Sequence, residues 1–305
     1  MRTSPHLPSA DDAWPRSAAP AQQLAQYRLL RSLGRGGLGE VFEAQAPDGR
    51  AVAIKTFLLR DDDQGLLASA FVREANLGQR LNHPDIVKVL DSGCHQDHAY
   101  LVMEFVAGHD LRRHTRAGNL LPLQQVLQIT QRVALALAAA HAIRVIHRDI
   151  KPGNVLVHGP SDTVKITDFG LARLGDAFRS RTGIIAGTPA YMSPEQLAEA
   201  TIGPASDLYA LGVVLFELLT GRLPHEATSL GELLLQVARH PAPPVDRFRP
   251  DLPAALVDLV AHLLHKKAPH RPQDGIAVAD QLAALLADLP QGLNPGWPGG
   301  PKSRG

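Results

Sequence analysis

The 305-residue chain has little of several things that mark particular classes of protein. It contains one cysteine, Cys94, so no disulfide can form within the chain and nothing demands an oxidising compartment. Acidic and basic residues nearly balance at a formal net charge of +1, which gives no broad positive field to hold nucleic acid or an anionic membrane. We therefore expect a cytoplasmic protein that does not bind nucleic acid.

Long apolar runs are missing as well. The longest stretches, such as residues 208–216, fall far short of the roughly 18 residues that a membrane-spanning helix needs. The N-terminal sequence MRTSPHLPSADDAWPRSAAP contains no apolar core of the kind that a secretory signal requires. The sequence thus predicts no membrane span.

Both ends of the chain differ in composition from the part between them. Residues 1–24 are rich in Pro, Ala and Ser, and residues 289–305 are rich in Gly and Pro, so we expect poorly ordered tails. The intervening residues 25–288 carry the periodic apolar patterns of a folded domain.

Two halves with different patterns make up this domain. Residues 25–106 contain short β-rich runs interrupted by one helical pattern near residues 67–81, which predicts a small sheet with one main helix. Residues 107–288 are dominated by helical patterns. An α+β fold with two lobes follows, and the cleft between them, near residues 104–110, is the expected place for a ligand.

A glycine-rich stretch, LGRGGLGEV at residues 33–41, lies between two predicted strands. Gly34, Gly36 and Gly39 leave backbone N–H groups free to approach a bulky anion such as a phosphate. By itself the pattern fits a plain hairpin turn equally well. A dinucleotide-binding fold would place a helix after the glycines, whereas EVFEAQA alternates like a strand and argues against that fold.

Lys55 ends the apolar run VAIK at residues 52–55. A lysine on a strand usually faces solvent. Next to the glycine loop, however, Lys55 would emerge into the cleft, where a buried ammonium needs an anion. Glu74, on the one predicted helix of this lobe, is the protein partner that we expect, with a local ion pair between Glu74 and Arg73 as the alternative.

The stretch VIHRDIKPGNVLV, residues 145–157, packs charged groups between apolar ones, which is unfavourable unless each charge is paired or used. Asp149 can accept a proton from a hydroxyl, Lys151 can neutralise a phosphate in transfer, and Asn154 can offer an amide oxygen to a metal. A structural ion-pair cluster would explain Arg148 beside Asp149, but it gives no reason for Lys151 or Asn154.

Asp168 lies at the end of a β-branched run in ITDFGLA, residues 166–172. A carboxylate at a strand end beside a cleft is a natural ligand for a hard cation such as Mg²⁺. A turn aspartate is the plainer interpretation, because Asp and Gly both favour turns.

In their order along the chain, GRGGLGEV, VAIK, HRDIKPGN and DFG resemble the signature of protein kinases, and the resemblance covers about residues 27–287. The chain looks most like the eukaryotic-type (Hanks-type) serine/threonine kinases of bacteria. The resemblance implies a bilobal fold, with a small antiparallel-sheet N-lobe at about residues 25–106 and a larger, mainly helical C-lobe at about residues 107–288. It also implies transfer of the γ-phosphoryl group of ATP to Ser or Thr hydroxyls of proteins.

The resemblance implies a role for each matching residue. Lys55 would contact the α- and β-phosphates and pair with Glu74, Asp149 would act as the catalytic base, and Asn154 and Asp168 would hold Mg²⁺, with Mn²⁺ as an alternative. The backbones of Glu104 and Val106 would bind adenine, with Met103 as gatekeeper. The implied ATP-binding residues are Leu33, Gly34, Arg35, Gly36, Gly37, Leu38, Gly39, Glu40, Val41, Ala53, Lys55, Met103, Glu104, Val106 and Leu156.

Arg148, directly before Asp149, implies regulation by phosphorylation of the activation loop, because a buried arginine at this position requires an anion. We expect autophosphorylation of the activation loop at Thr182, and after it at Ser180, with Arg148 binding the phosphate; self-association of two copies would allow this reaction. Both are otherwise simply loop hydroxyls. Lys151 together with Thr188 in GTPAY resembles the serine/threonine class of kinases.

Scaffold roles are implied for other residues. Glu195 should pair with Arg271, and Asp207 should brace the backbone of the HRD loop. Asp110 lies where family members bind the ribose or a basic substrate residue, although a helix N-cap explains it equally well. Gly78 departs from the family pattern of a larger apolar residue and would hold the helix of the N-lobe more loosely.

Two other functions stay open. A pseudokinase that only binds nucleotide or partners would commonly lose an equivalent of Lys55, Asp149 or Asp168, and this chain keeps all three. A small-molecule phosphotransferase would not need the segment ending in SPE at residues 193–195, which resembles a peptide-binding surface. Many bacterial relatives carry a membrane span and an outer domain after the kinase; this chain ends without either, so we expect a stand-alone soluble enzyme.

Overall fold

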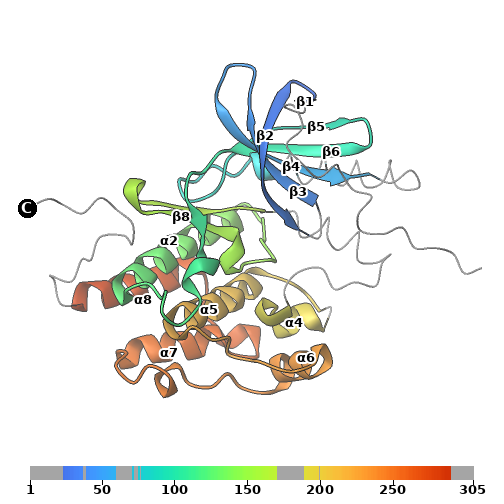
Figure 1. Cartoon of the computed structure of the whole chain (residues 1–305). Helices are drawn as coiled ribbons and strands as arrows, with labels where there is room; N and C mark the ends of the chain where they lie inside the picture. The colour runs from blue at the N-terminus through green and yellow to red at the C-terminus, as the bar shows by residue number, and fades with distance from the viewer. Residues whose placement is uncertain are drawn as a thin grey trace, which may run out of the picture.

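A computed structural model gives the fold of the chain and describes residues 23–36, 39–59, 71, 75, 77–169, 189–198 and 200–289. Figure 1 shows two lobes, a sheet above and a larger group of helices below, joined by the chain segment that follows β6. The two-lobed α+β architecture predicted from the sequence is confirmed.

The upper lobe is an antiparallel sheet of six strands in the order β1-β2-β3-β4-β6-β5. Each of the five longer strands coincides with a predicted run. β1 lies inside the stretch predicted as a tail, and its Leu24 is buried, so the folded part begins earlier than predicted. The strands are β1 (Gln23–Leu24), β2 (Tyr27–Gly36), β3 (Gly39–Gln45), β4 (Ala51–Leu58), β5 (Val89–His95) and β6 (His98–Glu104).

Alternation along β4 sorts its side chains between two apolar clusters. Val52 and Ile54 point to one face, where they pack with Phe42, and Ala53 and Phe57 point to the other. Successive side chains of a strand leave opposite faces of the sheet. The second face also contacts Phe71 and Ala75 of the helix predicted near residues 67–81, of which residues 71, 75 and 77–79 are described as helical.

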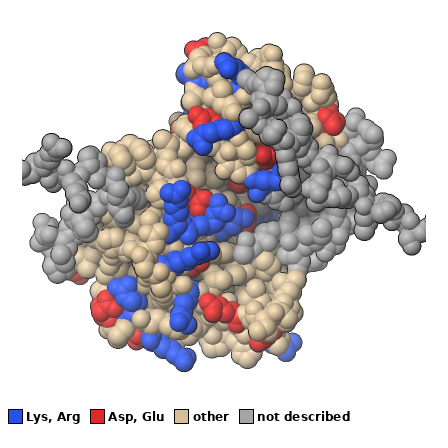
Figure 2. All heavy atoms as spheres, viewed as in Figure 1, with Lys and Arg blue, Asp and Glu red and all other residues tan. Residues whose placement is uncertain are grey.

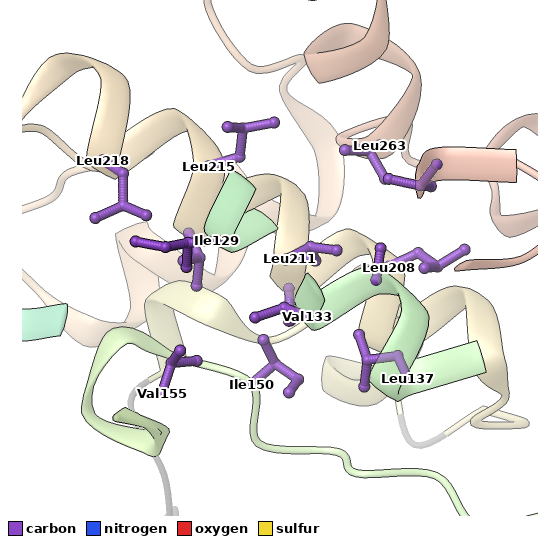
Figure 3. Close-up of a cluster of buried hydrophobic side chains, with 14 of the residues drawn as sticks. Ile129, Val133, Leu137, Ile150, Val155, Leu208, Leu211, Leu215, Leu218 and Leu263 are labelled. Carbon is purple, nitrogen blue, oxygen red and sulfur yellow. The ribbon is translucent and has the colours of Figure 1, made fainter. Parts of the chain in front are cut away.

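The lower lobe is built around two long helices, α2 (Leu123–Ala142) and α5 (Pro204–Thr220). α5 is apolar on nearly all sides, as expected for a buried central helix. Figure 3 shows Ile129 and Val133 of α2 facing Leu211 and Leu215 of α5, with Ile150 in the same cluster. Packed around them are α4 (Pro194–Leu197), α6 (Leu230–Arg239), α7 (Ala254–Leu263) and α8 (Gly275–Asp288).

A second, three-stranded sheet lies between the large sheet and the helices. It is formed by β7 (His109–Asp110), β8 (Val155–His158) and β9 (Thr163–Ile166). The sequence analysis did not resolve it, because strands this short carry little periodicity. The sheet matters for the site, because the β8–β9 hairpin joins the segment before β8, which carries Asp149, to the segment after β9, which carries Asp168.

Short 3-10 turns complete the part of the fold that frames the cleft. η2 (Leu111–His114) follows β7, and η3 (Pro152–Asn154) precedes β8. η3 begins at Pro152, whose fixed φ suits the first position of such a turn. Gly221 follows α5 with φ +73°, the left-handed conformation that commonly ends a helix.

Candidate active site

Lys55 reaches the cleft because it shares the face of β4 that carries Ala53 and Phe57. Its side chain is 11% exposed, and its Nζ lies 2.9 Å from Oδ1 of Asp168. A nearly buried ammonium requires an anion, and Asp168 is the anion here. The expected partner Glu74 lies outside the described residues.

Asp168 follows β9 with an uncommon φ of +66°, a left-handed conformation that Asp adopts more readily than most residues. Burial alone would raise the pKa of Asp168. The charge of Lys55 and its hydrogen bond outweigh burial, with smaller contributions from His147 and Lys151, so the pKa lies below its usual value. The carboxylate is therefore held in its charged form.

Asp149, Lys151 and Asn154 meet within one hydrogen-bonded loop. Lys151 Nζ lies 2.7 Å from Oδ2 of Asp149. Asn154 donates from Nδ2 to the same Oδ2 at 3.1 Å and to the Asp149 backbone carbonyl at 2.8 Å. Lys151 and Asn154 therefore orient the Asp149 carboxylate together. Because the Asn154 Nδ2 group is used in these bonds, its side-chain oxygen is the atom that can bind a cation.

Asp207 holds the backbone of this loop from below, as predicted. Its carboxylate is buried and accepts hydrogen bonds from the backbone N–H groups of His147 at 2.8 Å and Arg148 at 2.7 Å. His141 Nε2 lies 2.8 Å from Oδ2 of Asp207, the oxygen that also accepts the His147 N–H. Arg148 has φ +68°, and such a conformation persists where its surroundings hold it in place.

His147 joins the loop to the segment that carries Asp168. Its Nε2 lies 2.8 Å from the carbonyl of Thr167, and its Nδ1 accepts the N–H of Asp149 at 3.2 Å. A carbonyl can only accept, so Nε2 carries the proton of the neutral ring. The ring also packs edge-on to Phe169, with 4.5 Å between centroids, so His147 supports Phe169 as well as the loop.

Apolar residues from both lobes converge where the resemblance places adenine. Ala53 and Met103 are buried, and Val41, Val106 and Leu156 pack against the same cluster. The structure thus brings together residues that are as far apart in the chain as Val41 and Leu156.

The other predicted nucleotide-binding residues line the strands around the glycine loop. Leu33 is exposed, and Arg35 pairs with Glu40 at 3.2 Å across the β2–β3 turn. Gly39 has φ +150°, and a Cβ there would collide with the backbone of Thr56, so only glycine fits. Gly34 and Gly36 belong to β2, whereas Gly37 and Leu38 lie outside the described residues.

Glu104 has a contact that the sequence analysis missed. Its carboxylate accepts the backbone N–H of Lys88 at 2.8 Å and pairs with Lys165 Nζ at 2.6 Å. Because Lys165 belongs to β9 and Glu104 to β6, the pair links the two lobes next to the cleft. No short motif marks such a pair, because its members are separated by 61 residues.

Two further predictions have clear outcomes, and the surroundings of Gly78 are defined, although its effect on how the helix is held stays a prediction. Glu195 pairs with Arg271 at 2.6 Å, as predicted. Asp110 caps η2 by accepting the N–H of Arg112, which confirms the N-cap alternative. Gly78 lines a small cavity beside Phe169, and a Cβ there would lie 2.9 Å from Val89 Cγ2, so a larger residue would require Val89 to shift.

The predicted regulatory residues Thr182, Ser180 and Thr188 lie outside the described residues. For Arg148 the backbone is well fixed: its N–H is bound by Asp207, and its carbonyl accepts Nε2 of Gln196 at 2.8 Å. The expectation of a phosphate at Arg148 stays a prediction.

A cation in this cleft would depend on few protein ligands. The residues described by the structure contain no group of three or more His, Cys, Asp or Glu side chains placed to hold a metal. Asp168 and Asn154 are nevertheless neighbours, since the N–H of Thr167 bonds to the Asn154 carbonyl at 2.9 Å. Such a pair fits Mg²⁺, which uses one or two protein ligands together with phosphates and water.

Comparison with known proteins agrees with this geometry. The protein kinase domain matches residues 27–283. The chain is 40% identical over 273 residues to serine/threonine-protein kinase pkn2 of Myxococcus xanthus, covering 87% of the chain and 33% of that protein. It is 37% identical over 269 residues to serine/threonine-protein kinase PknA of Mycobacterium tuberculosis, covering 86% and 62% respectively.

The chain spans between about a third and under two thirds of the length of these relatives. No helix among the described residues is long and apolar enough to cross a membrane. Together with the described cleft, the match over most of the sequence shows that the chain belongs to the protein kinase family.

Proposed function

We propose that the chain is an active serine/threonine kinase that transfers the γ-phosphoryl group of ATP to hydroxyls of proteins. The observation that carries the proposal is the loop in which Asp149, Lys151 and Asn154 are joined by hydrogen bonds, below the Lys55–Asp168 pair. Phosphoryl transfer depends mainly on positioning and on charge stabilisation. The chain has all the charged groups that phosphoryl transfer requires.

The Asp149 carboxylate would orient the substrate hydroxyl and accept its proton. Its two partners hold it in place, and the Lys151 ammonium beside it would offset the negative charge of the phosphoryl group in transfer. Mg²⁺ or Mn²⁺, held by Asn154 and Asp168, would neutralise charge on the ATP phosphates. Lys55 would bind the α- and β-phosphates from the roof of the cleft.

The adenine ring would lie in the apolar cluster between Ala53 and Leu156. Its polar edge would meet the backbone of Glu104 and Val106, in the segment that joins the lobes. Met103, buried in the same cluster, would limit the depth of the pocket. The glycine loop at residues 34–39 would cover the phosphates.

The test is phosphorylation of a generic protein substrate with labelled ATP and Mg²⁺ by the wild type and by Asp149→Asn. We expect the variant to lose about 10²- to 10⁴-fold in rate, as is usual when a general base is removed. Binding of a fluorescent ATP analogue should be unchanged, because Asp149 serves the transfer step. Asp258→Asn, at an exposed position of α7, is the matched control and should behave as the wild type.

Equal labelling by the wild type and Asp149→Asn would show that another group does the chemistry. A wild type that binds the analogue and transfers nothing would make the chain a nucleotide-binding pseudokinase. Either result would overturn the proposal.

A further inference from the structure

Five exposed arginines lie along one face of the lower lobe, beginning at the catalytic loop. We call them the arginine strip. Figure 2 shows Lys and Arg side chains gathered between the lobes and down this face. The members of the strip are Arg112, Arg113, Arg116, Arg222 and Arg247.

The upper end of the strip borders the loop that carries Asp149. A Cβ built on Gly153 would lie 3.4 Å from Nε of Arg112, so the guanidinium lies over this glycine. Gly153 is next to Asn154, whose amide binds Asp149. Because one residue of an extended chain spans about 3.3 Å, Arg112 is within reach of side chains a few residues from a phosphoacceptor at Asp149.

The strip is continuous below Arg112. A Cβ on Gly221 would lie 3.5 Å from the backbone carbon of Arg116, which places Arg222 beside Arg116. The guanidinium carbons of Arg222 and Arg247 each lie 5.9 Å from the ring of Phe248. The Phe248 ring therefore lies between Arg222 and Arg247, the last two arginines of the strip.

At the upper end of the strip, the neighbouring carboxylate is already paired, and at the lower end Asp246 is exposed next to Arg247. Arg112 takes up the nearest carboxylate, Asp110, through two hydrogen bonds of 2.9 and 2.7 Å. Burial raises the pKa of Asp110, but the bonds and charge of Arg112 outweigh it and lower that pKa. Within the described part of the chain, the other four arginines form no ion pair, although Arg249 nearby pairs with Asp251. Near Asp149, a basic substrate side chain would meet in Asp110 a carboxylate that Arg112 already neutralises.

We propose that the arginine strip selects protein substrates that carry Asp or Glu near the phosphorylated Ser or Thr. The inference rests on the proposed kinase function and names its substrate class. Arg112, of which 74% of the side chain is exposed, contacts a carboxylate close to the phosphoacceptor. The lower arginines contact a more distant acidic stretch. Arginine suits this role because it is always charged and carries five N–H donors, so Arg112 can contact a substrate carboxylate with donors that Asp110 does not occupy.

The test uses three peptides, each with a single Ser or Thr, flanked by Glu, by Gln or by Lys. For the wild type we expect kcat/KM to be about tenfold higher for the Glu peptide than for the Gln peptide, since several weak exposed charge pairs act together. The preference should shrink as salt is added, because exposed charges are screened. The Lys peptide should be the poorest substrate.

Two variants locate the effect. Arg112→Glu should remove the preference for the Glu peptide and improve the Lys peptide. A fourth peptide, with its Glu residues placed farther from the Ser or Thr, tests the lower arginines, and the double variant Arg116→Glu, Arg222→Glu should weaken the preference for it. The matched control is Arg50→Glu, since Arg50 is 73% exposed and pairs with an aspartate two residues earlier, as Arg112 does. The control should keep the full preference, and all variants should keep the KM for ATP.

The Gln peptide distinguishes failure of the substrate preference from failure of the proposed kinase function. Turnover of Gln and Glu peptides at equal kcat/KM would overturn the arginine strip as a selector while leaving the kinase function intact. An unchanged preference in Arg112→Glu would do the same. Failure of every peptide and of a generic protein substrate would instead overturn the proposed function.

Discussion

At the scale of single residues, charged side chains in and below the site are paired with a residue of opposite charge. Lys55 has Asp168, Lys151 has Asp149, and Arg271 has Glu195. The members of the first two pairs were predicted from short motifs, because each motif places a charged residue at a fixed position in the sequence. The pairing of Lys55 with Asp168 was not predicted, since it depends on how the β8–β9 hairpin delivers Asp168 under β4.

Glu195 provides a prediction about stability. Burial raises its pKa, but hydrogen bonds from Arg271 and Ser206 outweigh burial and lower the pKa to about 2. A lowered pKa stabilises the fold above the unfolded value of 4.5, and this stability is lost as the pH falls toward 2. We expect Glu195→Gln to lower the free energy of unfolding at pH 7 by about 3 kcal/mol, since it leaves the buried Arg271 without its anion.

Urea denaturation of the wild type and Glu195→Gln at pH 7 and at pH 3.5 measures this effect. The difference between the two proteins should be smaller at pH 3.5, which lies below the unfolded pKa of 4.5, because unfolding of the wild type then takes up a proton on this carboxylate. Glu226→Gln, at an exposed position, is the control. A difference that does not depend on pH would show that the carboxylate charge is not what stabilises this contact.

At the scale of elements, how far the sequence predicts the fold depends on element length. β2, β3, β4, β5 and β6 were found because runs of seven or more residues carry a clear pattern. The sheet of β7, β8 and β9 was missed, because strands of two to four residues cannot show a period.

The start of α5 shows how an element positions a side chain. α5 begins at Pro204, so Asp207 lies in its first turn. In the first turn its carboxylate points beneath the catalytic loop, where it accepts the N–H groups of His147 and Arg148.

This contact predicts the effect of Asp207→Asn. An asparagine offers one acceptor oxygen and turns an NH₂ group toward a backbone donor, so at least one N–H of the loop loses its partner. We expect a loss of about 1–3 kcal/mol in the free energy of unfolding, typical of a buried donor left unsatisfied. The kcat should fall as well, because the positive φ of Arg148 is no longer held.

Thermal unfolding and steady-state kinetics at a temperature where the variant stays folded measure the two effects separately. Asp280→Asn, exposed on α8, serves as the control. If Asp207→Asn lowered stability while kcat stayed at the wild-type value, Asp207 would support the fold without positioning the catalytic loop.

At the scale of the whole molecule, the cleft is assembled from elements that no single motif contains. Val41 and Ala53 come from the upper sheet, and Leu156 comes from the lower lobe. The Glu104–Lys165 pair links the two lobes beside it. The order of the motifs therefore predicts which residues meet, but the contacts between lobes follow only from the fold.

Regulation by a second copy of the chain is the prediction that belongs to this scale. A phosphate adds about −1.5 to −2 charges at neutral pH, and Arg148, fixed at its backbone by Asp207 and Gln196, is the residue that we expect to bind it.

If one molecule phosphorylates another, the inactive Asp149→Asn chain should gain phosphate on Thr182 or Ser180 when the wild type is added. Mass spectrometry of a mixture in which the inactive chain carries a heavy-isotope label measures this directly. Asp149→Asn combined with Thr182→Ala and Ser180→Ala is the control and should gain none at these positions. Labelling confined to the wild-type chains at every concentration would show that the reaction is intramolecular.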